Sequence, residues 1–311
     1  MPNPFKGIPA FLGSGFYTAN TISRFQMARP YPQFSGNLAQ LGRNDSDLVY
    51  DSLQVNYNLR VASGLSLVTN FTWSKQIEKY GFNDAYTNTY QRGLYYLDRP
   101  YVLKVTPIYE LPIGKGKRFG ANAHGVWDKL ISGWQASSFF LDPFLGFPAD
   151  LPGNVRLLKD PSTAIGWSGN TDWKGYQVRA WSPCVLREGT DGSITPMPYS
   201  LNAGCGTDQS KYPFLFLAGY EPRFTDYRSS TIRKHHAFQV DASLLKTTKF
   251  GERIRTQLGF EAFNLFNHNY YGRDTFNTDP NNPNFGTMFP SQVSTQNMLP
   301  RQIQIRFKLN W

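Results

Sequence analysis

Apolar and polar residues alternate along several segments of the chain, most regularly in segment 301–311. Its odd positions from 303 onward carry Ile, Ile, Phe, Leu and Trp, whereas the even positions carry Gln, Gln, Arg, Lys and Asn. A period of two over a strand length, without Gly or Pro, predicts a β-strand with one apolar and one polar face. Because the segment ends on an aromatic residue and could cross a bilayer, the pattern favours a transmembrane strand over a soluble one.

The same alternation recurs upstream. Short turns at 62–64 and 250–252 join two pairs of these segments into predicted hairpins, and Pro107 indicates a bulge within a third segment. The pattern therefore predicts an all-β fold, an antiparallel transmembrane β-barrel segment of about seven to eight strands that forms a partial barrel. The alternating segments are 50–60, 65–74, 99–111, 133–141, 237–246 and 254–264.

Segments without sustained alternation are predicted as loops. They are 1–48, with one strand expected near 21–28, then 75–98, a long surface loop at about 142–235, and an Asn-rich loop at 267–300. Counted back from Trp311, the short turns at 250–252 and 62–64 fall on one side, and the long loops fall on the other. This parity is typical of an outer-membrane barrel with short periplasmic turns and long extracellular loops.

The predicted orientation also places aromatic side chains at two levels. Aromatic belts mark the two membrane interfaces of barrel proteins, because a ring can contact lipid while its polar edge meets water. The outer belt is predicted to contain Tyr50, Trp73 and Tyr101, and the inner belt Tyr109, Trp134 and Trp311.

Composition agrees with strands that face lipid on one side and water on the other. Aromatic residues make up 16% of the 311 residues and charged residues only 17%, and the mean hydropathy is −0.44. No apolar run is long enough for a transmembrane helix. The net charge of +10 comes from scattered Lys and Arg residues without a compact basic motif, so we expect no nucleic-acid partner.

Candidate chemistry is sparse, and we expect no enzyme activity, no cofactor and no metal. Cys184 and Cys205 lie in one Pro- and Gly-rich region and are candidates for a disulfide that closes a long loop, with two free thiols as the alternative. Asp241 and Glu261 could form an acid pair on the polar face, but a hydrogen-bonded ladder with Arg255 is the favoured interpretation. The four histidines, His124, His235, His236 and His268, lie in predicted turns or at strand ends, where a shared metal is not expected.

Six short motifs in sequence order carry a resemblance to a known family. The chain resembles the C-terminal barrel of Oar-like TonB-dependent receptors, which are abundant in Acidobacteria. One departure is Tyr101, where many relatives have His after Arg-Pro. The motifs are RPYPQF at 29–34, NFTWSK at 70–75, LDRP at 97–100, YELPIGKGKRF at 109–119, EAFNLFNH at 261–268 and RQIQ at 301–304.

The resemblance implies a nutrient transporter in which a plug, energised through TonB, sits in a barrel of about twenty-two strands. Since no secretory signal is visible and only about seven strands are predicted, we expect residues 1–311 to be the C-terminal portion of such a barrel, not competent for transport alone. The expected partners are membrane lipid, the barrel-assembly machinery, and the remaining strands with the plug. The expected location is the outer membrane, and the substrate cannot be read from the sequence.

The resemblance also gives segment 301–311 a role. Its apolar face and final aromatic residue, represented by Phe307, Leu309 and Trp311, resemble the signal that the barrel-assembly machinery reads. We expect this strand to have one unpaired edge. Two alternatives remain open from the sequence: an outer-membrane structural or adhesive protein whose loops bind a surface partner, and a secreted carbohydrate-binding β-sandwich.

Overall fold

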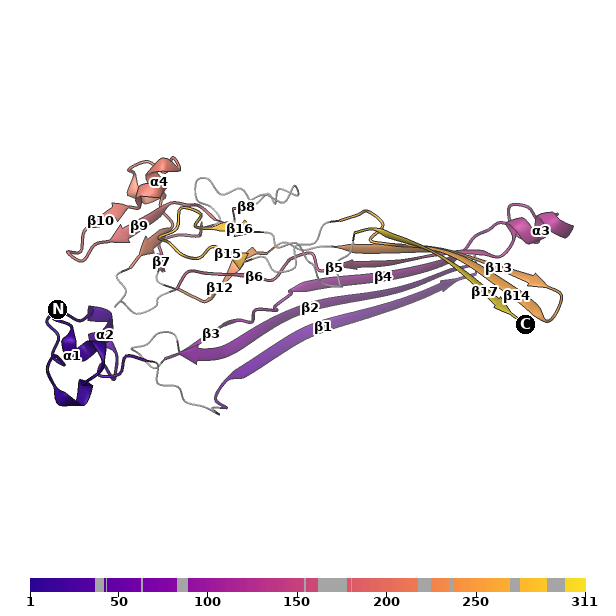
Figure 1. Ribbon diagram of the computed structural model, residues 1–311. Helices are drawn as coiled ribbons and strands as arrows, with labels where there is room; N and C mark the ends of the chain where they lie inside the picture. Colours follow the sequence, from indigo (N-terminus) through magenta and orange to yellow (C-terminus); the bar gives the residue numbers. More distant parts are fainter. Residues whose placement is uncertain are drawn as a thin grey trace.

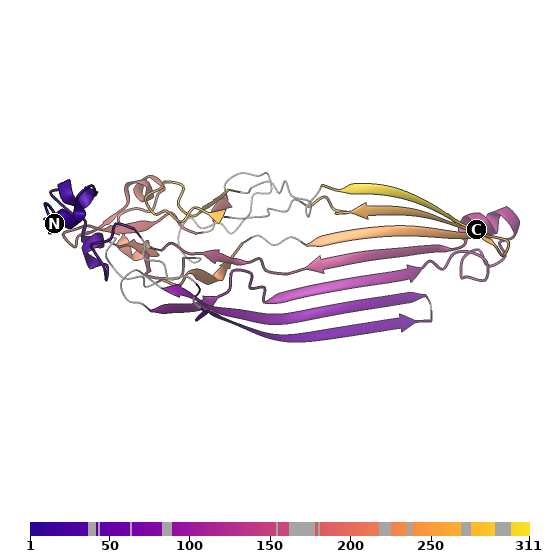
Figure 2. The ribbon, with the colours of Figure 1, turned by 60° about the horizontal axis from the view of Figure 1, so that its bottom comes forward.

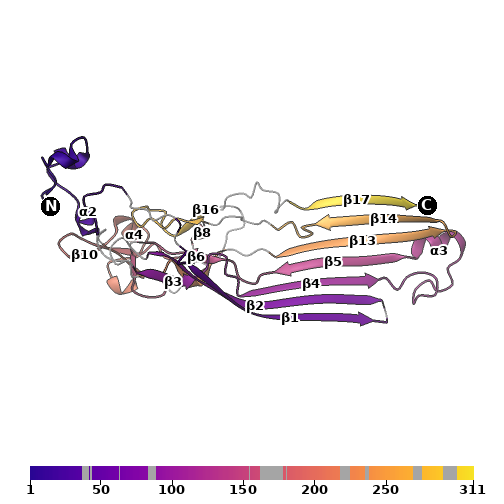
Figure 3. The same ribbon diagram turned by 90° about the horizontal axis from the view of Figure 1, so that it is seen from below.

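The computed structural model describes residues 1–36, 42, 44–62, 64–82, 89–153, 155–161, 178–179, 181–217, 225–234, 238–268, 275–289 and 300–311. Its main element is an antiparallel sheet with the strand order β1-β2-β4-β5-β13-β14-β17, on which β3 also pairs with β2 (Figures 1 and 3). The bounds are β1 Asp47–Val61, β2 Leu65–Phe82, β3 Tyr90–Leu94, β4 Tyr101–Glu110, β5 Trp134–Asp142, β13 Gln239–Phe250, β14 Ile254–Phe263 and β17 Gln302–Asn310.

The smaller strands lie beyond one end of this sheet (Figure 1). They form three small sheets, with the orders β10-β9-β11-β7, β12-β6 and β15-β16-β8. We call β6 to β12, α4, β15 and β16 together the loop module. Their bounds are β6 Pro148–Asp150, β7 Val155–Leu157, β8 Val178–Arg179, β9 Val185–Glu188, β10 Ile194–Pro196, α4 Pro198–Asn202, β11 Phe214–Phe216, β12 Arg228–Arg233, β15 Thr275–Phe276 and β16 Thr287–Phe289.

The helices are short. They are the 3-10 turns Pro9–Phe11 and Gln209–Lys211 and the helices α1 Gly15–Thr18, α2 Arg24–Ala28, α3 Gly125–Ile131 and α4. None of the helices in the described ranges is both long and apolar enough to span a bilayer.

The register of the main sheet places the predicted apolar positions on one face. Val61 pairs with Leu65, Leu65 with Tyr109, and the row continues across every later strand to Ile305. The adjacent row, one residue away along each strand, lies on the opposite face. It consists of Arg60, Ser66, Ile108, Ser137, Ser243, Glu261 and Gln304. The all-β prediction with one apolar and one polar face is therefore confirmed.

The ends of the sheet differ as the loop lengths predicted. The turns β1–β2 and β13–β14 and the connection that carries α3 lie at one end, together with the C-terminus (Figure 2). The loop module and residues 1–36 lie toward the other end (Figure 1). In an outer-membrane barrel the end with short turns is the periplasmic one.

The sheet is open. β1 and β17 are its first and last strands, and within the described residues neither pairs along its outer edge. The apolar side chains of β17 are correspondingly exposed, with 74% of the surface of Ile303, 67% of Ile305 and 66% of Phe307 uncovered. No second sheet covers this face in the described part of the chain, so the β-sandwich hypothesis fails.

Three local predictions were wrong. The segment 75–98 was predicted as a loop, but β2 continues to Phe82 and β3 pairs with it. The segment 21–28 contains the helix α2 and no strand, because the Ser23 side chain accepts a hydrogen bond from the Gln26 N–H at 3.1 Å and caps the helix. Pro107 causes no bulge: the β4–β5 ladder omits Thr106 and Pro107 and then resumes in the same register.

The hydrophobic core lies in the loop module, away from the main sheet. Of the buried hydrophobic residues in the described ranges, all except Ile22 lie between 149 and 285. Trp181 is fully buried at its centre, with ring centroids 5.3 Å from Phe276 and 5.8 Å from Phe285. The predicted long surface loop is therefore a packed structure with its own core, whereas the main sheet exposes its apolar face.

Gly133, immediately before β5, gives a prediction about the periplasmic end. Its φ is 78°, and a Cβ there would lie 2.2 Å from the backbone oxygen of Thr247. We expect Gly133→Ala to lower the free energy of unfolding by about 2 kcal/mol, because it combines a left-handed conformation with a backbone clash. Gly116→Ala is the matched control, since its φ is 71° and its Cβ would meet nothing; it should cost about 1 kcal/mol. Equal losses in denaturant titrations would contradict the close approach of β5 to β13.

Candidate functional site

A buried ion pair fixes the loop module to the main sheet. Asp98, which is only 1% exposed, accepts a hydrogen bond from Nη1 of Arg233 at 2.8 Å and another from the backbone N–H of Gln76 at 2.8 Å. Arg233 Nη1 also donates to the backbone oxygen of Asp98 at 3.1 Å. One carboxylate therefore joins the end of β12 to the outer part of β2 through charge-assisted hydrogen bonds.

The neighbours of Asp98 complete this junction and give a structural reason for the LDRP motif. The guanidinium of Arg99 lies over the ring of Phe147, 4.2 Å from its centroid. The backbone oxygens of Arg99 and Pro100 accept hydrogen bonds from the side chain and backbone of Ser74, both at 2.8 Å. Residues 98–100 thus contact both β2 and the segment that leads into β6.

Arg228, at the start of β12, makes a second junction. Its Nη1 pairs with Glu78 on β2 and donates to the backbone oxygen of Leu94 on β3 at 2.8 Å. Its Nε lies 3.3 Å from Asp150 on β6, which also pairs with Lys234 at 3.2 Å. Both ends of β12 are therefore held by arginines against β2, β3 and β6.

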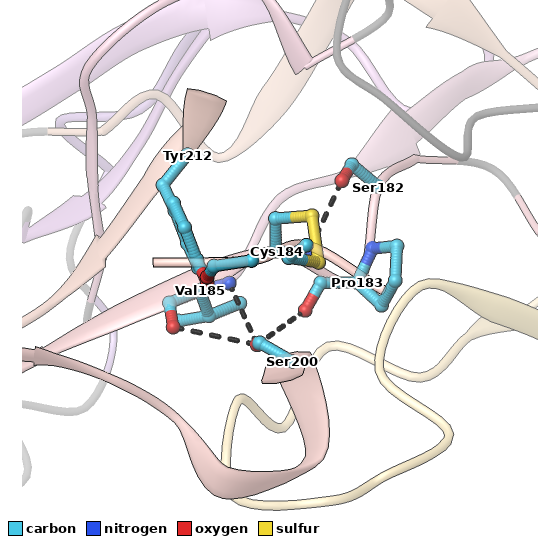
Figure 4. Close-up of a disulfide and its surroundings, with 8 residues drawn as sticks. Ser182, Pro183, Cys184, Val185, Ser200 and Tyr212 are labelled. Atoms are coloured by element: carbon cyan, nitrogen blue, oxygen red, sulfur yellow. Dashed lines mark hydrogen bonds between the residues drawn. A yellow bond between two sulfur atoms is a disulfide. The ribbon is translucent and has the colours of Figure 1, made fainter. Parts of the chain in front are cut away.

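Cys184 and Cys205 are joined in a disulfide, with their Cα atoms 5.7 Å apart (Figure 4). Ser200 of α4, fully buried beside it, donates to the backbone oxygen of Pro183 at 2.7 Å and accepts from the N–H of Val185 at 3.0 Å. The disulfide and Ser200 close the segment that contains β9, β10 and α4. They sit within a buried cluster of Cys184, Leu186, Cys205, Tyr212, Leu215 and Leu217.

Tyr212 in this cluster gives a pH prediction. Burial raises the pKa of Tyr212 above its ordinary value of 10.0, and its hydroxyl donates to the backbone oxygen of Gly206 at 2.6 Å. The pKa of Tyr212 is higher in the folded state than in the unfolded state. The stability contributed by its protonated hydroxyl is therefore fully present below pH 10 and is lost as the pH rises from 10 through the folded pKa. We expect the loop module to lose stability over that alkaline range, and Tyr212→Phe to remove this part of the pH dependence in thermal melts. An unchanged alkaline loss in Tyr212→Phe would contradict the assignment.

The predicted belt residues that lie on the strands can be placed in the sheet, and their role at the membrane interfaces stays a prediction. Trp73 pairs with Tyr101 on the outer part of the apolar face, and Tyr109 lies on the same face near the opposite end. Trp134 is there too, with Nζ of Lys246 5.1 Å from its ring centroid. Tyr50 was misplaced: it pairs with Gln76 and lies three residues from Leu53, the partner of Trp73, so alternation puts it on the polar face.

The C-terminal residues lie on the apolar face of an edge strand. Phe307 pairs with Leu258 and Leu309 with Thr256 of β14. Trp311 follows β17 and is 90% exposed. The assembly-signal role of these three residues stays a prediction.

The acid pair is not formed, and the favoured ladder has a different arginine. Glu261 lies 3.3 Å from Arg306 of β17, whereas Arg255 pairs in register with Lys249 and Asn310. Asp241 accepts instead from the Asn264 N–H and from Gln239, both at 2.8 Å. Alternation correctly predicted that Asp241 and Glu261 lie on the polar face, but not which arginine pairs with Glu261.

The histidines offer no metal site in the described ranges. His268 packs edge-on against Phe238, with centroids 4.1 Å apart, and His124 precedes α3. His235 and His236 lie outside the described residues. No group of three or more His, Cys, Asp or Glu side chains suited to a metal occurs within the described residues.

Comparison with known proteins agrees with this architecture. A family model described as an outer membrane beta barrel domain matches residues 2–304. No curated protein and no solved structure matches the chain. The antiparallel sheet, its single apolar face and the asymmetry of its loops are typical of such a domain. This chain therefore belongs to the outer membrane beta barrel domain family and is a protein of the outer membrane.

Proposed function

We propose that this chain forms part of the wall of an Oar-like TonB-dependent transporter that takes up a large nutrient, together with further strands and a plug. The observation that carries the proposal is that the sheet has a continuous polar face and, at its extracellular end, a packed loop module. A barrel wall built this way lines an aqueous interior beneath a structure able to contact a solute before entry. The six sequence motifs support the Oar-like assignment.

The open edges of β1 and β17 support the requirement for further strands. An unpaired strand edge in a bilayer leaves N–H and C=O groups without partners, which costs several kcal/mol for each group. Pairing with additional strands satisfies them. The proposal includes no catalytic step, and energy is supplied through the plug.

Energised uptake tests the proposal. Cells that carry the protein in their outer membrane would be compared with a deletion strain, using fluorescent pools of oligosaccharides and peptides with and without a protonophore. We expect periplasmic accumulation of at least one pool that requires both the protein and the proton gradient.

Two results would overturn the proposal. Accumulation that is independent of the protein or insensitive to the protonophore excludes TonB-dependent uptake. Protein-dependent binding at the cell surface without accumulation favours instead a structural or adhesive outer-membrane protein whose loop module binds a partner.

A further inference from the structure

The polar face of β1, β2 and β4 contains a hollow with a volume of about 390 Å³. Two rows of the register supply its polar lining: Gln54 pairs with Thr72, and one row below, Asn56 pairs with Asn70, which pairs with Lys104. Phe71 and Val102 complete the lining. We call the hollow with these five polar residues the amide hollow. Three amides, a hydroxyl and an ammonium group therefore meet on three adjacent strands.

The side chains of the amide hollow are not used to hold the sheet together. In the described part of the chain, Asn56, Asn70, Thr72 and Lys104 make no side-chain hydrogen bond or ion pair, and Gln54 makes only a long contact of 3.5 Å with Ser52.

The other half of the wall is different. Ser137 and Ser243 bond each other at 2.7 Å, and Glu261 pairs with Arg306 at 3.3 Å. The polar groups of β5, β13, β14 and β17 therefore satisfy one another in part, whereas those of the amide hollow are available to a solute.

The charge around the hollow is positive. Over 52–60, 66–74 and 102–110, the charged residues are Arg60, Lys104 and Glu110. Glu110 lies at the periplasmic end, where Lys117 pairs with it at 3.3 Å. Lys104 thus has no carboxylate partner among the described residues, and an anionic group is the complement that it lacks.

We infer that the amide hollow is a binding subsite for a carboxylate-bearing, hydroxyl-rich solute of the acidic oligosaccharide class. Amide side chains both donate and accept, so they match neighbouring hydroxyl groups, and Lys104 pairs with the carboxylate. The inference rests on the proposed transport function and names the substrate class. A polypeptide segment with acidic side chains is the competing occupant.

The test measures binding by the full chain in detergent, by calorimetry, with tetragalacturonate as the acidic probe and maltotetraose as the neutral probe of equal length. We expect the acidic probe to bind at least about tenfold more tightly, and Lys104→Gln to weaken it about tenfold. The matched control is Lys308→Gln, which removes the same charge from β17 at the far edge of the sheet. It should leave the affinity unchanged. Asn70→Ala should weaken both probes.

The outcomes separate this inference from the transport proposal. Equal binding of the two probes, no binding, or equal losses in Lys104→Gln and Lys308→Gln would overturn the acidic-solute subsite. Tighter, Lys104-dependent binding of a glutamate-rich peptide would assign the hollow to a polypeptide and overturn it too. Binding that follows the prediction without energised uptake in cells would refute transport and leave the subsite intact.

Discussion

Replacing Asp98 with alanine is expected to lower the free energy of unfolding of the loop-module junction by about 3 to 5 kcal/mol. The substitution leaves the Arg233 guanidinium, whose side chain is only 12% exposed, without its counter-charge. It also removes the acceptor of the Gln76 N–H. Breaking a buried pair by removing one partner is costly because the remaining charge stays desolvated. Hydrogen exchange of the amides in β12 and the outer part of β2 measures the effect.

Two variants sharpen this prediction. Asp150→Ala also removes a carboxylate that contacts arginine, but Asp150 is 53% exposed, so the loss should stay within about 1 kcal/mol. The double variant Asp98→Leu with Arg233→Met removes both charges and should recover most of the stability. If Asp98→Ala and Asp150→Ala behave alike, the junction does not depend on the buried pair.

Removing the disulfide is expected to destabilise the loop module by about 3 kcal/mol and to leave the main sheet intact. The bond closes a segment of 21 residues in sequence separation, and a closed loop of this size restricts the unfolded chain by about that amount. The double variant Cys184→Ala with Cys205→Ala should become sensitive to protease within 184–205 at a lower temperature. Hydrogen exchange of the amides in β1, β2 and β4, which reports the main sheet, should not change.

A reductant provides the control for this prediction. It should reproduce the protease sensitivity in the parent protein and have no further effect on the cysteine-free variant. A variant whose loop module resists protease like the parent protein would show that the buried clusters around Trp181 and Tyr212 suffice without the bond.

The membrane-crossing part of the fold could be predicted from the sequence because lipid and water impose a period of two. All seven strands predicted from alternation occur, and apart from the end of β2 their bounds lie within four residues of the prediction. The prediction ended too early for β2, since its strand pairing continues to Phe82 where the lipid no longer requires an apolar face. Tyr50 was misplaced because the prediction used only its position along β1. Tyr50 is three residues from Leu53, an odd number, so the two side chains lie on opposite faces of the sheet.

The loop module could not be predicted, because its strands are two to six residues long and most pair with distant segments. Its core gathers Ala149, Trp181, Phe214 and Phe285 from separate parts of the chain, and no local pattern marks them. Asp98 illustrates the same limit. The LDRP motif could be recognised, but the role of Asp98 depends on Arg233, which lies 135 residues later.

The most direct test of the central claim, that the apolar face of the sheet contacts lipid, is spin-label accessibility in bilayers. Single cysteines would replace Leu67, Val105 and Ile305 on the apolar face, and Val68, Thr106 and Gln304 on the polar face, with the Cys184–Cys205 disulfide retained. We predict that collisions with oxygen dominate at 67, 105 and 305, and collisions with a water-soluble nickel chelate at 68, 106 and 304. Equal accessibility at neighbouring positions, or the reverse alternation, would contradict a membrane-spanning wall.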